Sequence, residues 1–518
     1  MEMQRILWAD DEIDLLKPHI LFLTEKGYET VTAHSGNDAI ELFRKEPFDI
    51  VFLDENMPGL SGIETLLRIK NMNENIPVVM ITKSEEETIM EDAIGSKIAD
   101  YLIKPVNPKQ ILLSLKKNLE TKRLVSEKTN TQYQQEFRQI GMMLGDRLTH
   151  QGWVELYKKL IYWELQLENI NDDSMHEILV QQKEEANRLF SKFVESNYIS
   201  WLKNPEKDAP LMSQHLLKRR VIPAAESDDT PVFMLLIDNL RFDQWKIIEP
   251  AISELFRVVE EDTYYSILPT ATQYARNSIF AGILPSEIEK MHPKWWTYDD
   301  DEGGKNNHEE ELLLDQIQRL RKNIKTSYTK ITNLDAGKDM VDNIPNLFNN
   351  KLNVIVYNFV DMLSHARTDM QVIRELADDE SAYRSITKSW FEHSPLLEAL
   401  KRIAQKNVKL IITTDHGTIR VKEPSKIIGD RTTNTNLRYK QGKNLNYEKR
   451  DVFEIKNPAE AFLPRVNVST TYVFAKQDKF FAYPNNYNHY VNHYRNTFQH
   501  GGVSLEEMIV PYITLVTK

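Results

Sequence analysis

Short apolar segments alternate with amphipathic ones over the first 120 residues of the chain. Between the apolar segments, hydrophobic residues recur at helical spacing, for example at Ala39, Leu42 and Phe43. Strands that alternate with helices form a parallel sheet covered on both faces. The pattern therefore predicts a small doubly wound α/β domain at residues 1–120, with strands at Ile6–Ala9, Glu29–Ala33, Ile50–Leu53, Val78–Thr82 and Tyr101–Ile103.

The pattern changes to a helical one between residues 121 and 222. This region is rich in Gln, Glu and Lys, and its apolar residues keep helical spacing, as in Trp153, Leu156 and Leu160. Few glycines interrupt it, so we expect packed helices and not a flexible tether. The sequence predicts an all-helical connector between two α/β regions.

Nearly continuous apolar strands return after residue 223, at Val232–Asp238, Val354–Val360 and Leu410–Thr414. Strands of this kind lie at the centre of a sheet that is buried on both faces. Each strand ends in an acidic residue or leads into a loop that contains one. Because ligands of open α/β sheets bind beyond the carboxyl ends of the strands, we expect these acids to converge. Residues 223–518 are therefore predicted to form a large α/β domain.

Composition restricts the chemistry and the location of the protein. The chain has 518 residues, a formal net charge of −12 and no cysteine. The negative charge disfavours wholesale attraction to nucleic acid or to an anionic membrane. The absence of cysteine leaves histidine nitrogen and carboxylate oxygen as the main metal ligands. No stretch approaches the ~20 apolar residues of a spanning helix, so we expect a cytoplasmic protein without membrane insertion.

Five polar residues follow the strands of the first domain: Asp10, Asp11, Asp54, Thr82 and Lys104. A carboxylate can accept a phosphoryl group only when a divalent cation offsets the charge of the two anions, and neighbouring acids supply ligands suited to Mg²⁺. One acid alone is better explained as a helix cap. The five positions in order favour a phosphorylation site.

These motifs resemble the receiver domain of two-component response regulators, which implies a flavodoxin-like fold. The resemblance rests on Trp8-Ala9-Asp10-Asp11-Glu12, Leu53-Asp54-Glu55-Asn56-Met57-Pro58-Gly59 and Lys104-Pro105. It implies that a sensor histidine kinase phosphorylates Asp54 and that phosphorylation leads to a homodimer. It further implies that Mg²⁺ is bound by Asp10, Asp11, Asp54 and Asn56, and that Thr82, Tyr101 and Lys104 form the switch.

A second set of possible metal ligands follows the strands of the third domain. Asp238 and the pair Asp415-His416 each follow an apolar strand, and Asp361 and His365 are four residues apart, as two ligands on one helical turn are. Each aspartate alone could cap a helix, and each histidine could be an ordinary hydrogen-bonded one. Together they are typical of a site in which two cations hold the attacking and leaving oxygens of phosphoryl transfer. Thr272 is the candidate for the attacking hydroxyl.

The Asp415-His416-Gly417 motif and the Asp361/His365 pair resemble the alkaline phosphatase superfamily, and within it the PglZ-type domains. This resemblance implies two Zn²⁺ per chain, with Mn²⁺ as the alternative. It also implies a nucleophilic threonine, Thr272, although Thr270 stays open from sequence. The first metal would be held by Asp238, Thr272, Asp415 and His416, and the second by Asp361, His365 and His500.

A receiver joined through helices to a PglZ-type domain is similar to the PorX regulators of type IX secretion. The resemblance implies a response regulator whose effector hydrolyses phosphodiesters, with cyclic or linear oligonucleotides as substrates. The alternative is a non-catalytic signalling protein whose metal-bound domain docks a sigma factor or a secretion component. A DNA-binding transcription factor is disfavoured, because no short helix-turn-helix segment follows the receiver.

Three further features bear on the substrate. Residues 420–450 hold nine Lys or Arg against three acids, typical either of a solvated loop or of a groove for a polyanion in which Tyr439 and Tyr447 could stack on bases. Arg241 and Arg276 could supply the extra cation that a monoesterase needs. His489 and His493 are four residues apart and could chelate a metal, although a hydrogen-bonded loop is the simpler explanation.

Overall fold

The computed structural model describes residues 4–73, 76–82, 98–168, 173–298, 304, 306–358, 360, 379–430 and 433–518. Two predicted metal ligands, Asp361 and His365, lie outside these ranges. The chain divides into two compact units, Met1–Gln135 and Glu136–Lys518.

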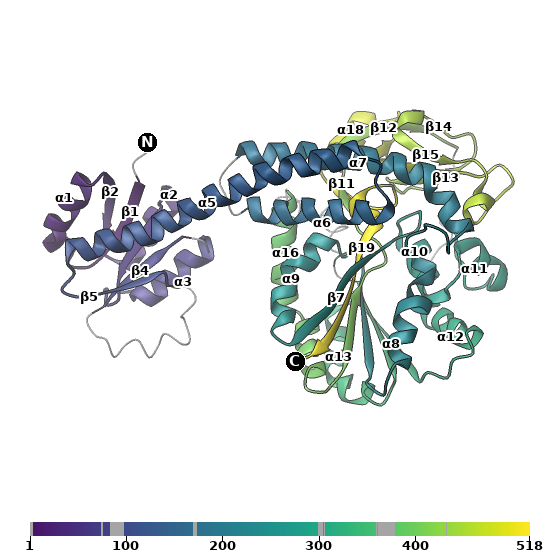
Figure 1. The fold of residues 1–518 in the computed structure, drawn as a ribbon, viewed down its shortest axis with the longest axis horizontal. Coiled ribbons are helices and arrows are strands. Elements are labelled where there is room, and N and C mark those ends of the chain that lie inside the picture. The colour runs from purple at the N-terminus through teal and green to yellow at the C-terminus, as the bar shows by residue number, and fades with distance from the viewer. Residues whose placement is uncertain are drawn as a thin grey trace. The chain divides into compact units, whose positions relative to one another are not determined.

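The first unit contains a five-stranded parallel sheet in the order β2-β1-β3-β4-β5 (Figure 1). The strands form where the sequence predicts them: β1 (Gln4–Ala9), β2 (Tyr28–Ala33), β3 (Ile50–Asp54), β4 (Val78–Thr82) and β5 (Asp100–Ile103). The helices described around the sheet are η1 (Ile13–Leu16), α1 (Lys17–Glu25), α2 (Gly36–Lys45), α3 (Gly62–Met72) and the beginning of α5 (Pro108–Gly145). This is the predicted flavodoxin-like fold.

Both faces of this sheet are buried. In β1, Leu7 and Ala9 belong to a hydrophobic cluster on one face, whereas Ile6 and Trp8 belong to a cluster on the other. Because side chains alternate between the faces of a strand, an uninterrupted apolar strand requires two covering layers. The prediction of a doubly wound sheet is therefore confirmed.

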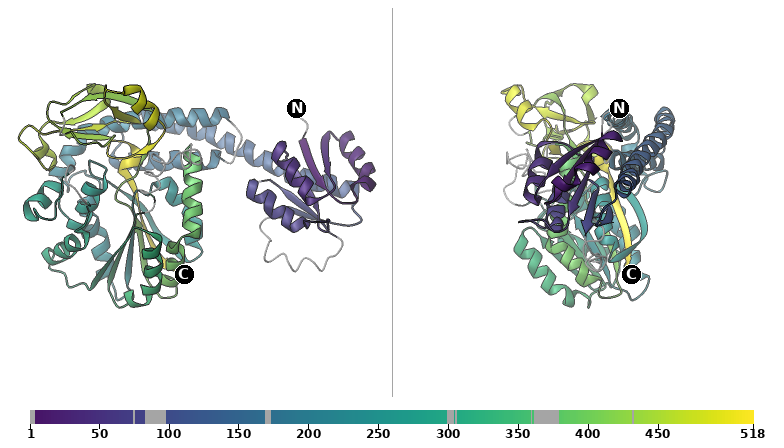
Figure 2. Two further views of the ribbon diagram at one scale, coloured as in Figure 1. Left: turned by 180° about the vertical axis from the view of Figure 1, so that it is seen from behind. Right: turned by 90° about the vertical axis from the view of Figure 1, so that its left-hand side faces the viewer.

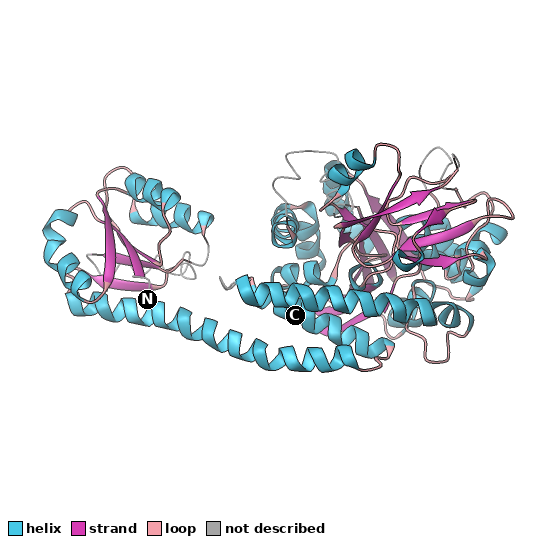
Figure 3. Cartoon of the chain, turned by 90° about the horizontal axis from the view of Figure 1, so that it is seen from above, coloured by secondary structure: helices cyan, strands magenta, loops and turns pink. Residues whose placement is uncertain are grey.

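The connecting region is helical, as predicted. Helix α5 runs from the first unit into the second, and α6 (His150–Leu167) packs against α7 (Asp173–Lys203) within the second unit (Figure 3). The Thr149 hydroxyl accepts a hydrogen bond from Gly152 N and caps α6. Trp153 of α6 meets Phe190 of α7 edge to face, with ring centroids 5.5 Å apart. The predicted domain limits at residues 120 and 222 fall inside α5 and at the start of α8 (Ile222–Glu226).

The second unit is built on a six-stranded mixed sheet in the order β7-β19-β10-β6-β9-β8. The four strands from β10 to β8 are parallel, and β19 runs antiparallel to both β10 and β7. The strands are β6 (Val232–Ile237), β7 (Phe256–Tyr265), β8 (Thr326–Ile331), β9 (Leu352–Tyr357), β10 (Lys409–Thr413) and β19 (Ile509–Thr517). The carboxyl ends of the parallel strands share one edge, where the predicted site lies.

Helices surround this sheet, and a group of short strands lies beyond one of its ends (Figure 2). The helices include α9 (Phe242–Ser253), α10 (Thr272–Ala281), α11 (Pro285–Met291), α12 (Glu309–Arg319), α13 (Leu334–Leu347), α16 (Glu380–His393), α17 (Pro395–Ile403), α18 (Tyr487–Tyr494) and α19 (Leu505–Met508). The short strands are β11 (Ile419–Arg420), β12 (Glu423–Ile428), β13 (Tyr439–Gly442), β14 (Asn446–Tyr447), β15 (Val452–Ile455), β16 (Thr471–Ala475), β17 (Lys479–Ala482) and β18 (Phe498–Gln499). Within the described ranges, no helix is sufficiently long and apolar to span a membrane.

Candidate functional site

The first unit gathers its acidic residues at the carboxyl edge of the sheet. Asp10 follows β1, Asp54 ends β3, and Lys104 follows β5. The Lys104 Nζ lies 3.0 Å from Asp10 Oδ2 and 2.8 Å from Asp54 Oδ1. One carboxylate oxygen from each of Asp10, Asp11 and Asp54 lies within 4.8 Å of the others. These oxygens suit a hard cation such as Mg²⁺.

Burial raises the pKa of the Asp54 carboxyl, and the nearby Asp10 and Asp11 add to this, whereas Lys104 opposes it. Thr82 ends β4 and is buried, and its carbonyl accepts a 2.7 Å hydrogen bond from Lys104 N. Tyr101 in β5 is partly buried and packs against the hydrophobic cluster that includes Leu7 and Ala9. Asn56 is exposed. The structure therefore brings Asp10, Asp11, Asp54, Thr82 and Lys104 to one edge of the sheet.

In the second unit, residues from two neighbouring strands form a buried cluster. Asp238 follows β6, and Asp415 and His416 follow β10, the strand that pairs with β6. His416 Nε2 lies 4.0 Å from Asp238 Oδ1 and 3.9 Å from Asp415 Oδ2. One ligand atom of each of the three side chains lies within 4.8 Å of the others. Two carboxylates and an imidazole are a typical donor set for a transition-metal ion.

The His416 ring is oriented by the backbone carbonyl of the next residue, Gly417. Its Nδ1 lies 3.1 Å from the carbonyl oxygen of Gly417, an acceptor, so Nδ1 carries the proton. Nε2 then has a lone pair directed towards Thr272, whose Oγ1 lies 3.1 Å away. An imidazole held in this way by a second hydrogen bond is prepared to bind a metal.

The two candidate threonines are in different environments. Thr272 is the first residue of α10 and is half-buried, with its hydroxyl beside His416. Thr270 is fully buried, and its hydroxyl donates to Gly502 O and accepts from Gly501 N, both at 3.0 Å. The Thr270 hydroxyl is therefore already engaged in two backbone hydrogen bonds, whereas the Thr272 hydroxyl faces the acidic cluster.

His500 lies next to the cluster. Its ring stacks on that of His416, with centroids 4.3 Å apart and an angle of 18° between the planes. Its Nδ1 lies 3.0 Å from the carbonyl oxygen of Thr270, which again leaves Nε2 with the lone pair. Four predicted residues, Thr272, His416, His500 and Asp238, therefore meet although they are distant in sequence.

Arg276, which the sequence indicates only as a possible extra cation, is a central part of the cluster. Its guanidinium is fully buried, donates from Nε to Asp415 Oδ2 at 2.9 Å and pairs with Asp238 Oδ2. It also contacts Asn358 Oδ1 at 3.1 Å and Glu309 Oε1 at 3.4 Å. Burial would raise the pKa of Asp415, but the Arg276 guanidinium brings this pKa below its ordinary value.

Glu309 is a buried residue that sequence reasoning missed, because it begins a run of three acids that looks like an exposed helix start. Lys330 pairs with Glu309 at 3.1 Å. Three carboxylates, Asp238, Asp415 and Glu309, thus face two cationic side chains, Arg276 and Lys330. A buried excess of negative charge is costly, so a bound cation would stabilise this cluster. The donor set and its charge both fit a metal ion.

The basic stretch at residues 420–450 is only partly a surface feature. Arg438 is fully buried and pairs with Glu507 at 2.6 Å. Lys440 is buried too, and burial lowers its pKa to about 7. Tyr439 is buried, so its ring is not presented for base stacking, whereas Tyr447 is partly buried against a hydrophobic cluster and its hydroxyl donates to Glu454. The exposed cations of the stretch include Lys426, Lys449 and Arg450.

The remaining candidates are less closely connected to the cluster. Arg241 pairs with Asp243 and Glu380, and not with Asp238 or Asp415. His489 and His493 stack on α18 with ring centroids 6.2 Å apart. In the part of the chain that the structure describes, these two histidines belong to no group of three possible metal ligands.

Family models match three consecutive parts of the chain. A response regulator receiver domain matches residues 6–116, and a PorX response regulator linker domain matches residues 123–202. The BREX system PglZ alkaline phosphatase-like domain matches residues 216–515, more than half of the chain. The chain belongs to the PglZ family. The PorX-like order of receiver, linker and PglZ domain that the sequence indicates is confirmed.

Curated relatives match a smaller part of the chain. The alginate biosynthesis transcriptional regulatory protein AlgB of Pseudomonas syringae pv. tomato is 34% identical over 120 residues, which are 23% of this chain and 27% of that protein. The transcriptional regulatory protein ZraR of Escherichia coli K12 is 34% identical over 137 residues, 26% of this chain and 31% of that protein. The chain therefore spans less than a third of the length of these two relatives.

Among solved structures, the response regulator TrrA from Thermotoga maritima is 31% identical, with a TM-score of 0.21, and covers 23% of this chain and 100% of its own. The chemotaxis regulator CheY4 of Vibrio cholerae is 30% identical, with a TM-score of 0.21 and the same coverage. The chain combines a response regulator receiver domain with an alkaline phosphatase-like domain.

Proposed function

We propose that the PglZ-family domain is a zinc-dependent phosphodiesterase whose nucleophile is Thr272. The observation that carries this proposal is the position of the Thr272 hydroxyl, 3.1 Å from His416 Nε2. His416 is in turn next to the buried carboxylates of Asp238 and Asp415. A hydroxyl among metal-binding groups at a helix start has the surroundings that a phosphoryl-transfer nucleophile requires.

Asp238, Asp415, His416 and Thr272 would hold one ion, and His500 with Asp361 and His365 would hold the other. Zinc is favoured over manganese by the three histidines among these ligands. When bound, the ions would lower the pKa of the attacking hydroxyl and offset the charge on the phosphoryl oxygens.

The protein groups around Thr272 have separate tasks in this reaction. Because His416 Nε2 lies 3.1 Å from the Thr272 hydroxyl, the two groups would share one ion, with the Thr272 oxygen held in place to attack phosphorus. The Thr272 Oγ1–P bond would form as the bond to the leaving alcohol breaks, and the proton lost by the Thr272 hydroxyl would pass through solvent to the leaving oxygen. Water would then cleave the Thr272–phosphate ester and restore the Thr272 hydroxyl. The N-terminus of α10, which begins at Thr272, favours the negative charge of the phosphoryl group.

The position of Arg276 favours diesters over monoesters. A monoester carries one more negative charge than a diester and needs an additional cation beside the metals. The Arg276 guanidinium is already bound to Asp238, Asp415, Glu309 and Asn358. It therefore acts on the ligand carboxylates, and a singly charged phosphodiester is the better substrate. Cyclic or linear oligonucleotides are the substrates that the family resemblance implies.

For the first unit, we propose that Asp54 accepts the phosphoryl group with Mg²⁺ at Asp10, Asp11, Asp54 and Asn56. Thr82, Tyr101 and Lys104 would respond to it, and the phosphorylated chain would form a homodimer. The PorX linker match supports a role in the control of type IX secretion. Analytical ultracentrifugation with and without beryllofluoride tests dimerisation, which Asp54→Ala should abolish.

The enzymatic proposal is tested with the zinc-loaded full-length chain and bis(p-nitrophenyl) phosphate. We expect Thr272→Ala to lower the hydrolysis rate by at least about a thousandfold, as loss of a nucleophile does elsewhere. Thr24→Ala is the matched control, because Thr24 is exposed in α1 of the first unit. A wild type no faster than Thr272→Ala would contradict the proposal. The effector would then act by docking a sigma factor or a secretion component.

A further inference from the structure

The helical connector contacts the chain segments that carry the proposed catalytic residues. Helix α6 and all of α7 except its last residue fall within the match to the PorX linker domain. Within the second unit, these helices hold three separate segments through buried polar groups. One segment precedes Thr272, another follows His500, and the third follows Asp238.

The first anchor is Tyr198 of α7. Its hydroxyl accepts a 2.7 Å hydrogen bond from the backbone N–H of Leu268, four residues before Thr272. Tyr198 is 1% exposed, and its ring meets that of Phe453 edge to face. The connector thus fixes the backbone that leads into α10 and places the nucleophile.

The second anchor is Asn187 of α7. Its Oδ1 accepts a 2.8 Å hydrogen bond from Leu505 N, and its Nδ2 donates to Glu506 Oε2 at 3.0 Å. Four residues further along α7, the Ser191 hydroxyl lies 3.3 Å from Val503 O. The connector therefore binds one side of residues 503–506.

The opposite side of this segment faces the metal ligands. The carbonyl oxygen of Glu506 would lie only 2.0 Å from a Cβ at position 417, so Gly417, directly after His416, permits this close approach. Gly501 N donates to Thr270 Oγ1 at 3.0 Å, and His500 Nδ1 lies 3.0 Å from Thr270 O. A shift of the segment held by Asn187 would therefore move His500 and the residues around His416.

The third anchor is an ionic chain that begins at Glu164 of α6. Lys183 of α7 pairs with Glu164 at 2.6 Å, and Arg384 pairs with Glu164 at 3.2 Å and with Asp243 at 2.8 Å. Burial would raise the pKa of Glu164, but Lys183 and Arg384 lower it below its ordinary value. Asp243 accepts from Arg241, three residues after Asp238. This chain links the connector to the segment that carries Asp238.

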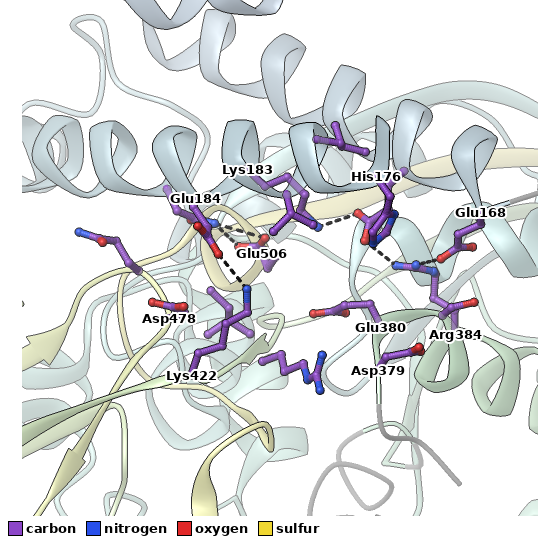
Figure 4. A pocket seen from close by; sticks show the side chains of 18 of the residues that line it. Glu168, His176, Lys183, Glu184, Asp379, Glu380, Arg384, Lys422, Asp478 and Glu506 are labelled. Atoms are coloured by element: carbon purple, nitrogen blue, oxygen red, sulfur yellow. Dashed lines mark hydrogen bonds and ion pairs between the residues drawn. The ribbon is translucent and has the colours of Figure 1, made fainter. Parts of the chain in front are cut away.

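A cavity of about 810 Å³, lined largely by charged side chains, lies beside α7 (Figure 4). Lys183 and Glu184 extend from the helix towards it, opposite Lys422, Glu380 and Glu506. Here Lys422 bridges to Glu184 at 2.9 Å. Because α7 borders a cavity at this point, individual polar contacts connect it to the rest of the second unit. Each of these contacts can be removed by a separate substitution.

We infer that α6 and α7 are a positioning part of the metal centre, with Asn187 and Tyr198 as the residues that hold Thr272 and His500 in place. This inference rests on the proposed function. Since none of these anchors is placed against substrate, their loss should alter metal binding and kcat and leave KM nearly unchanged. A connector that serves only to hold the fold together would show no such selectivity.

The test compares Asn187→Ala and Tyr198→Phe with two matched controls in the full chain. Asn197→Ala removes an asparagine of α7 that donates to Phe193 O in its own helix. Tyr157→Phe removes a hydroxyl of α6 that is buried and has no hydrogen-bond partner within the described residues. Zinc affinity is measured by competition with a chromogenic chelator, and kinetics are measured with bis(p-nitrophenyl) phosphate.

We expect Asn187→Ala and Tyr198→Phe to weaken zinc binding several-fold and to lower kcat by roughly tenfold to a hundredfold, as displaced catalytic groups do. Both controls should match the wild type. If Asn187→Ala does not fold, Tyr198→Phe, which removes a single oxygen, still provides the test. If the wild type is active and both anchor variants match their controls in zinc affinity and kcat, this inference is overturned. The proposed function is not affected by that result. If the wild type binds zinc without hydrolysing the diester, the proposed function fails, and the zinc affinities still test the positioning.

Discussion

Thr272 Oγ1 lies 3.1 Å from His416 Nε2, although 144 residues separate the two along the chain. The sheet topology explains this meeting. His416 follows β10, and Thr272 lies beyond β7, which has the same direction as β10 because β19 runs antiparallel to both. Both residues therefore emerge at the same edge of the sheet.

The two threonines before and at the start of α10 should differ in their effect on stability. Thr270→Ala leaves the buried Gly501 N–H and Gly502 carbonyl without their partner, which costs about 1–3 kcal/mol. Thr272→Ala removes a half-buried hydroxyl and should change stability by less than about 0.5 kcal/mol. Urea denaturation followed by tryptophan fluorescence measures both. Equal destabilisation by the two variants would contradict the separate roles assigned to them.

Arg276→Ala should make the stability of the second unit strongly dependent on metal. Without the guanidinium, the buried carboxylates of Asp238 and Asp415 lose their ion pairs with Arg276, and removal of one member of a buried ion pair costs about 3–5 kcal/mol. Zinc would replace part of the missing positive charge. The zinc-induced rise in melting temperature should therefore be larger in the variant than in the wild type. Arg188→Ala, which removes a partly exposed guanidinium paired with Glu185, is the control.

Much of the fold and part of the site could be predicted from sequence, because strand periodicity and the residues directly after each strand are local features. The meeting of Asp238 with Asp415 follows from the parallel pairing of β6 and β10. Arg276 could not be placed in this way, because its partners come from four distant segments. The Asp361 and His365 ligands stay a prediction, since they lie outside the described residues.

The basic stretch shows a different limit of sequence reasoning. A count of charged residues in the sequence includes Arg438 and Lys440 among the cations that could attract a polyanion. In the fold, both side chains are buried. The partner of Arg438 is Glu507, which lies 69 residues further along the chain. Local charge therefore cannot distinguish a surface cation from one with a distant buried partner.

Asp54→Asn should stabilise the first unit at neutral pH. Burial raises the pKa of Asp54, so the folded state binds its proton more tightly than the unfolded state does. The resulting stability is complete below the ordinary aspartate pKa of about 3.9 and is lost as the pH rises through the raised folded pKa. The advantage of Asp54→Asn should thus grow from acid to neutral pH in thermal denaturation. Asp14→Asn, at an exposed position, should show no such trend.

The exposed cations Lys449 and Arg450 should matter for long substrates only. Lys449→Glu combined with Arg450→Glu should raise KM for an oligonucleotide by about tenfold at low salt and reduce the salt dependence of binding. Hydrolysis of bis(p-nitrophenyl) phosphate should be unchanged, because this substrate is too small to extend along a charged surface. An oligonucleotide KM that is insensitive to both charge reversals would favour the solvated-loop interpretation of residues 420–450.

The metal content of the purified full-length chain tests the central claim most directly. Elemental analysis after dialysis should find about two zinc ions per wild-type chain, as a two-metal phosphoesterase requires, and about one fewer in His416→Ala. If the analysis finds manganese in place of zinc, the metal assignment changes, but the proposed ligands do not. A wild type without stoichiometric metal, or a His416→Ala variant that retains the full wild-type content, would contradict the account.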